Sequence, residues 1–154
     1  MATRSDDIRL LNELVEVTID SMDGYRAAAG DSGEPGLREL FRYRAQERRI
    51  ASELLRRQVR ALGGEPRDEG SVLASAHRVF MNLRNRVQDD DAAVIAEVER
   101  GENHIRAKYE AALAAGRLTP SSRHAVLQAY ESVLTGQDEA SHMAHALHPG
   151  QDRE

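Results

Sequence analysis

The stretch IAEVERGENHIRAKY, residues 95–109, decides the fold of this chain. Apolar side chains and one carboxylate recur in it at alternating spacings of three and four residues: Ile95, Val98, Glu102, Ile105 and Tyr109. This spacing places all five on one face of an α-helix. The stretch therefore predicts a long core helix with one acidic position in the middle of its apolar face.

Three further stretches carry a similar stripe, each with a polar position near its middle. They are Ile8, Leu11, Val15, Thr18, Met22 and Tyr25; Leu40, Glu47, Ala51 and Leu54; and Val126, Tyr130, Val133, Gln137, Ala140 and Ala144. Four such helices side by side would form one polar layer inside an apolar bundle, where bundles place metal and ligand sites. The layer predicted by the four stripes consists of Thr18 with Met22, Glu47, Glu102 and Gln137.

Composition restricts the class of protein. The chain has 154 residues, enough for one domain with its own core. Its net charge of −5 argues against a nucleic-acid binder, and the absence of cysteine excludes disulfides and thiolate ligands. No run approaches the roughly 18 apolar residues of a membrane span, and residues 1–9 lack the apolar core of a secretory signal. We therefore expect a cytoplasmic protein that binds neither membranes nor nucleic acid.

Caps and helix breakers divide the chain into five expected helices, at about residues 5–29, 37–62, 71–87, 92–115 and 121–147. Ser5, followed by two aspartates, is expected to cap the first helix. The connections after the first and fourth helices are short, so those helices should form hairpins with the next ones. Two hairpins joined by a crossover along the bundle define ferritin-like topology. We expect a ferritin-like antiparallel four-helix bundle over residues 4–148, with a short crossover helix at 71–87 and a frayed tail at 149–154.

Several strings resemble a known family. They are LNELVEVTID, GYRAAA, LRELFRYRAQER, LGGEPRDEGSVL and VIAEVERGENH. Together they resemble a bacterial family of ferritin-like four-helix-bundle proteins that is described only as a domain of unknown function, and the resemblance covers about residues 10–140. It implies a ferritin-like fold and a bacterial source, and no established reaction. The chain departs from the family pattern at Met22, where Glu is frequent, and at Gln137, where His is frequent.

The first hypothesis for the polar layer is a carboxylate-bridged metal site. Ferritin-like di-iron sites use one Glu on each of two helices and Glu-x-x-His on the other two, and such ligands suit iron. Glu47 and Glu102 occupy two of these positions, but Ile50 stands where a His is needed and Gln137 replaces a Glu. A nearby pair has the Glu-x-x-His spacing but lies off the apolar stripe: Glu139 and His142. The hypothesis is therefore an incomplete site for iron or another divalent ion.

The second hypothesis is structural. A buried carboxylate must be paired or protonated, and Arg44 is placed to pair with Glu47 or with Glu102. Four tyrosine hydroxyls are candidates for hydrogen bonds into the same layer: Tyr25, Tyr43, Tyr109 and Tyr130. Such a layer would fix the register of the helices without any chemistry. The poor ligands Met22 and Gln137 favour this hypothesis over a metal site.

Two charged clusters have simpler interpretations. The second helix carries a row of arginines on one face: Arg38, Arg42, Arg49, Arg56 and Arg60. The row would suit phosphate, nucleic acid or an acidic partner. Because the total charge is negative and no aromatic residue interleaves, we expect a solvated row that pairs with acidic residues of the first helix: Glu13, Glu16, Asp20 and Asp23. The histidines near the C-terminus recur every three residues and are expected on the surface: His142, His145 and His148.

No catalytic residues or cofactor-binding residues stand out. The sequence contains no nucleophile–base pattern and no glycine-rich phosphate loop after a strand. Two function classes stay open. The first is a non-catalytic bundle that acts through self-association or a protein partner, with stress physiology as one setting. The second is a metal-binding protein with an incomplete carboxylate site centred on Glu47 and Glu102.

Overall fold

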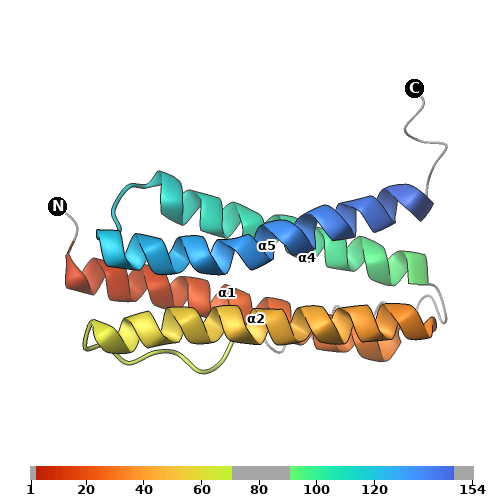
Figure 1. Cartoon of the computed structure of the whole chain (residues 1–154), viewed down its shortest axis with the longest axis horizontal. Helices are drawn as coiled ribbons and strands as arrows, with labels where there is room; N and C mark the ends of the chain where they lie inside the picture. The colour runs from red at the N-terminus through yellow and green to blue at the C-terminus, as the bar shows by residue number, and fades with distance from the viewer. Residues whose placement is uncertain (1–2, 71–90, 148–154) are drawn as a thin grey trace.

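The protein is all-α. A computed structural model describes residues 3–70 and 91–147, and within these ranges it contains four long helices and no strand (Figure 1). The helices are α1 (Arg4–Asp31), α2 (Pro35–Ala61), α4 (Asp91–Ala114) and α5 (Pro120–Leu147). Each begins and ends within two residues of the expected bounds, which confirms those predictions. The helix expected at 71–87 and the tail at 149–154 lie outside the described residues.

The four helices form a bundle in which each packs mainly against two neighbours. α1 packs against α2 and α4, and α5 packs against α2 and α4. Figure 1 shows α1 and α5 running in one direction and α2 and α4 in the other. α2 therefore ends at one end of the bundle and α4 begins at the other. No helix in the described ranges is long and apolar enough to cross a membrane.

Capping side chains and glycines set the helix ends. Thr3, and not Ser5 as expected, caps α1, because its hydroxyl accepts a hydrogen bond from the backbone N–H of Asp6 at 3.1 Å. Gly63 ends α2 at a φ of 83°, a left-handed conformation that glycine adopts readily. The N–H of Gly64 then bonds to the carbonyl of Val59 at 2.9 Å, which closes a Schellman cap.

Two aspartates tie each hairpin to the turn of the other. Asp7 is fully buried and accepts hydrogen bonds from the backbone N–H and the hydroxyl of Thr119, in the turn between α4 and α5. Asp91, at the start of α4, accepts from the N–H groups of Gly33 at 2.7 Å and Glu34 at 3.1 Å, in the turn between α1 and α2. Both ends of the bundle are therefore held in register by a carboxylate.

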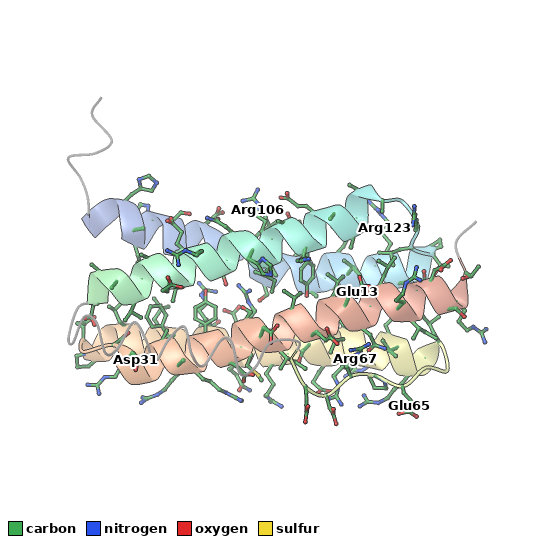
Figure 2. All side chains as sticks on the ribbon, turned by 180° about the vertical axis from the view of Figure 1, so that it is seen from behind. Glu13, Asp31, Glu65, Arg67, Arg106 and Arg123 are labelled. Carbon is green, nitrogen blue, oxygen red and sulfur yellow. The ribbon has the colours of Figure 1, made fainter. Side chains whose placement is uncertain are left out.

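The segment after α2 turns back along the outside of α1. The side-chain amide of Asn12 donates to the carbonyl of Glu65 at 3.1 Å and accepts from the N–H of Arg67 at 2.9 Å. Figure 2 shows Glu65 and Arg67 on this segment beside α1. A Cβ at Gly64 would lie 2.9 Å from the Ile8 side chain, so the close approach requires glycine. The connection to α4 thus starts along α1.

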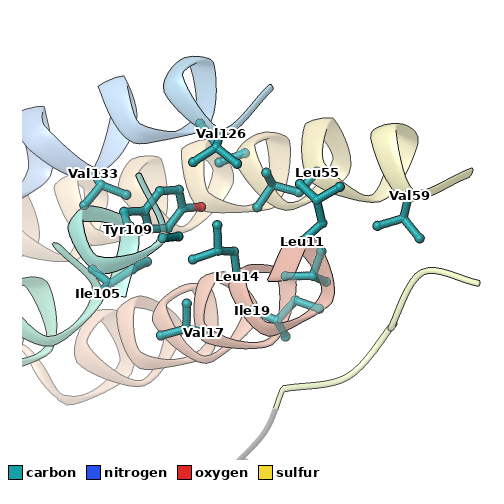
Figure 3. Close-up of a cluster of buried hydrophobic side chains, with 14 residues drawn as sticks. Leu11, Leu14, Val17, Ile19, Leu55, Val59, Ile105, Tyr109, Val126 and Val133 are labelled. Atoms are coloured by element: carbon teal, nitrogen blue, oxygen red, sulfur yellow. The ribbon is translucent and has the colours of Figure 1, made fainter. Parts of the chain in front are cut away.

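The core is divided into two clusters along the bundle. The cluster shown in Figure 3 is the larger. Its buried members are Leu11, Leu14, Val15, Val17, Ile19, Ala51, Leu55, Val59, Ile105, Tyr109, Ala112, Val126, Ala129 and Val133. The second cluster lies toward the other end and consists of Tyr25, Ala28, Ala29, Phe41, Ala45, Val94, Ile95, Val98 and Ala140. Between them, the helices bring polar residues or glycine into the interior.

One hydroxyl pair lies inside the larger cluster. The Thr18 hydroxyl donates to the carbonyl of Leu14 at 2.6 Å, so it accepts its second hydrogen bond from the Tyr109 hydroxyl, also at 2.6 Å. Tyr109 is fully buried and stacks on Tyr130, with ring centroids 5.8 Å apart. Burial raises the pKa of Tyr109 to about 12, although the bond to Thr18 opposes the rise. The neutral phenol is therefore the form that the fold accommodates.

This burial predicts alkaline destabilisation. The folded-state pKa of Tyr109 lies above the usual value of 10.0, so its contribution to stability is complete below pH 10 and is lost as the pH rises toward 12. We expect the free energy of unfolding, measured by urea denaturation, to fall by about 2–3 kcal/mol between pH 9.5 and 12 on account of this group. Tyr109→Phe should show a smaller fall over the same range. Identical pH profiles for the two proteins would contradict the prediction.

Candidate functional site

A buried ion pair joins α2 to α4 between the two core clusters. Arg48 donates from Nη2 to Oε2 of Glu102 at 2.6 Å, and the two side chains are 0% and 2% exposed. A charge-assisted bond of this kind is strong in a low-dielectric interior, but both ions lose their hydration. The pair therefore persists only if the remaining polar atoms are also satisfied.

Residues from the other two helices bind the terminal nitrogens of Arg48, whereas its buried Nε has no hydrogen-bond partner among the described residues. Its Nη1 donates to the Ser21 hydroxyl on α1 at 3.1 Å, and Nη2 reaches the backbone carbonyl of Ser132 on α5 at 3.4 Å. The guanidinium carbon lies 5.5 Å from the ring centroid of Tyr25, a cation–π distance. One arginine thus contacts all four helices of the bundle.

The pKa values of the two acidic groups reflect this burial. Burial raises the pKa of Glu102, while the Arg48 guanidinium and a hydrogen bond with the Tyr25 hydroxyl oppose the rise. Burial also raises the pKa of Tyr25, and the nearby Glu102 carboxylate raises it further. Tyr25 therefore stays neutral and donates its hydrogen bond to Glu102.

On α5, the glycine at position 136 makes room for the buried ion pair between Arg48 and Glu102. A Cβ at Gly136 would stand 2.7 Å from Oε2 of Glu102 and 3.3 Å from the Tyr25 hydroxyl, and it would also collide with Arg48. Glycine inside a helix costs about 0.5–1 kcal/mol relative to alanine, so its presence needs a local reason. The reason here is the close approach of α5 to the buried charges.

The predicted polar layer is right in position and partly wrong in membership. Glu102 lies in it, but Glu47 does not face Glu102. The Glu47 side chain is 26% exposed and accepts from Arg44 Nη1 at 2.5 Å, and the other terminal nitrogen of Arg44 pairs with Glu139 on α5. The expected bond between Arg44 and Glu47 is therefore present, and the alternative bond to Glu102 is made by Arg48 instead.

On α2, the face that is buried is rotated around the helix axis from the stripe that the sequence predicted. The buried face of this helix consists of Phe41, Arg44, Ala45, Arg48, Ala51, Ser52, Leu55 and Val59. Leu40, Glu47 and Leu54 were expected on that face and lie on its flank, half-buried. The true stripe contains two arginines, which an apolar pattern does not count. Position 137 belongs to α5, but its side chain lies outside what the structure describes.

The metal hypothesis can be compared with these positions. Glu47 and Glu139 meet at Arg44, Glu102 is bound to Arg48, and His142 is exposed. Ile50 is 54% exposed, so the register expected for a Glu-x-x-His motif on α2 points outward. Among residues 3–70 and 91–147, no group of three or more His, Asp or Glu is arranged to hold a metal ion.

Only one of the four candidate tyrosines joins the buried ion pair. Tyr25 does so, whereas Tyr109 bonds to Thr18 in the larger cluster. Tyr130 donates to Glu110 at 2.9 Å near the surface. Tyr43 is 60% exposed, so its expected role in the layer is wrong.

The expected pairing of the arginine row with α1 is also wrong where partners are seen. Arg56 bonds to Glu53 at 2.6 Å on its own helix. On α1, Glu16 pairs with Arg67 and Asp23 with Arg26. The row on α2 therefore remains a basic strip on the surface.

A cavity of about 360 Å³ lies between α1 and α4 beside the ion pair. Its lining includes apolar side chains, two glycines, and polar and charged residues from both helices: Asp20, Ser21, Tyr25, Glu97, Arg100, Glu102 and His104. The carboxylate side of the ion pair is therefore the side that faces this space.

Fold and site together define an all-α bundle with a buried, arginine-neutralised polar layer. Residues 6–115 match a family model described as "Domain of unknown function (DUF2383)". The chain belongs to this family. The match covers α2, α4 and all but the first residues of α1, so Ser21, Tyr25, Arg48 and Glu102 lie within the family domain and Gly136 lies beyond it. No curated protein matches the chain.

Two glycine substitutions test the packing around the ion pair. Gly136→Ala should destabilise the protein by about 1–3 kcal/mol, because overpacking against the buried charges outweighs the better helix propensity of alanine. Gly101→Ala, in the interior of α4, is the matched control, because a Cβ there meets nothing within 4 Å. It should stabilise the protein by about 0.5–1 kcal/mol. Urea denaturation measures both, and equal effects at the two sites would refute the close packing at Gly136.

A double-mutant cycle tests the ion pair itself. Arg48→Met leaves the Glu102 carboxylate buried without its cation and should cost about 3–5 kcal/mol. Adding Glu102→Leu removes the unpaired charge, so the double variant should recover most of that loss. Arg49→Met, on the exposed neighbour, should change stability by less than about 0.5 kcal/mol. If the losses of stability caused by Arg48→Met alone and by Glu102→Leu alone simply add in the double variant, the two side chains do not interact as described.

Proposed function

We propose that this protein is a non-catalytic bundle of ferritin-like topology that acts through contacts with other protein molecules, copies of itself included. The opposite directions of neighbouring helices, and a connection that leaves α2 at one end of the bundle and enters α4 at the other, support this topology (Figure 1). A bacterial source, which rests on the sequence resemblance, and a cytoplasmic setting are also part of the proposal.

The observation that carries the proposal is the internal neutralisation of the carboxylates. Glu102 is bound by Arg48, and Glu47 and Glu139 are both bound by Arg44. A metal ion binds ligands that are deprotonated and free to coordinate, and arginine stays charged at any relevant pH. Each guanidinium therefore competes for the oxygens that a cation would need and repels the cation itself. An interior of this kind supports a structural role and leaves the surface to carry function.

Elemental analysis tests this proposal against its alternative, a site for iron or another divalent ion centred on Glu47 and Glu102. The untagged protein would be incubated with Fe²⁺ or Zn²⁺, desalted and analysed. We expect no stoichiometric metal, because the arginines already occupy the carboxylates.

Matched variants locate any metal that is found. One or two equivalents that disappear in Glu47→Ala and Glu102→Ala would establish the alternative and overturn the proposal. Binding that survives both changes but is lost in His142→Ala would place the metal at the end of α5, away from the polar layer.

A further inference from the structure

A second stripe runs along α2 outside the core. Its residues follow spacings of three, four, three and four: Leu40, Tyr43, Glu47, Ile50 and Leu54. Tyr43 and Ile50 are 60% and 54% exposed, which makes them the two most exposed of the large hydrophobic side chains in the described ranges. This spacing is that of a helix seam in a coiled coil. The stripe is thus arranged to pack against another helix.

The polar member of the stripe is already neutralised. Glu47 accepts from Arg44, whose other terminal nitrogen pairs with Glu139 on α5. These bonds place the stripe on the flank of α2 that faces α5. A partner helix on this flank would cover the ion-paired Glu47. The next position of the stripe is the exposed Arg57, so the apolar part of the stripe ends at Leu54.

Charged residues border the stripe at its two ends. Glu39 and Arg60 are exposed. Glu39 immediately precedes Leu40, and Arg60, the last member of the arginine row, immediately precedes Ala61. Between them on the same side, Gln46 and Glu53 bond to arginines one turn later on α2. Glu39 and Arg60 themselves form no ion pair within the described part of the chain. Within residues 3–70 and 91–147, one end of the stripe therefore carries an unpaired negative charge and the other an unpaired positive charge.

We propose that this stripe binds the same stripe of a second copy of the chain, antiparallel and around a two-fold axis between Glu47 and Ile50. The axis brings Tyr43 against Leu54 of the partner subunit and, twice, Glu39 near Arg60 of the partner subunit. A parallel arrangement would instead place like charges opposite each other. An isologous contact of this kind closes after two subunits. The inference deepens the proposed function and rests on its self-association.

Sedimentation equilibrium of the full chain tests the surface. The wild type should give about twice the chain mass of 17.1 kDa. Ile50→Asp places a charge in the middle of the contact and should raise the dimer dissociation constant by about 100-fold or more. Leu127→Asp is the matched control, because Leu127 is 42% exposed but lies on α5, away from the stripe. It should leave the dissociation constant unchanged.

A charge exchange tests the antiparallel geometry. Glu39→Arg or Arg60→Glu alone should weaken the dimer by about 10-fold, since each places like charges together twice. The double variant should restore wild-type affinity. Lys108→Glu, at an exposed position of α4, controls for the change in net charge and should have no effect. Circular dichroism checks that every variant keeps its helix content.

The possible failures can be told apart. A wild type that remains monomeric at all concentrations would overturn both the proposed dimer contact and the self-association in the proposed function. The measurement of metal content would not be affected by this result. A dimer that withstands Ile50→Asp would overturn this surface and leave self-association intact. A dimer that is lost in Ile50→Asp but indifferent to the charge exchange would overturn the antiparallel arrangement.

Discussion

The buried bond between Arg48 and Glu102 is the constraint on which the bundle depends. It stands between the two apolar clusters and draws a contact from every helix. Apolar packing alone tolerates sliding, because one leucine fits much like another a turn away. A buried charge does not, since any slip leaves an ion unpaired at a cost of several kcal/mol. We infer that the pair contributes more to the choice of helix register than to net stability.

The same constraint explains features at a distance from the pair. α5 gives up a side chain at Gly136 so that it can approach the charges. At the two ends, Asp7 and Asp91 each hold the turn of the opposite hairpin. The helices are therefore in register at three levels, and in each the fixing group is a carboxylate with donors from another part of the chain. Apolar side chains fill the space between these levels.

The sequence predicted the parts of this arrangement that depend on periodicity. The stripe through Glu102 is long and regular, so its face and its buried carboxylate could be inferred correctly. The face of α2 could not, because Arg48 is followed by Arg49 and an arginine pair resembles a solvated surface. Nothing in the local sequence distinguishes the buried member from the exposed one. The role of Gly136 could not be predicted either, because it depends on which atoms of other helices lie close to this position.

The position of arginine bears directly on function. In a bundle with a metal centre, the inward carboxylates hold a cation between the helices. Here a guanidinium from the chain itself supplies that positive charge at Glu102, and a second one joins Glu47 to Glu139. While the carboxylates are ionised, each of these arginines offsets the charge of the carboxylates that it binds. Under the proposed function, the outer faces make the contacts that matter, and α2 carries both a basic row and a partly apolar stripe.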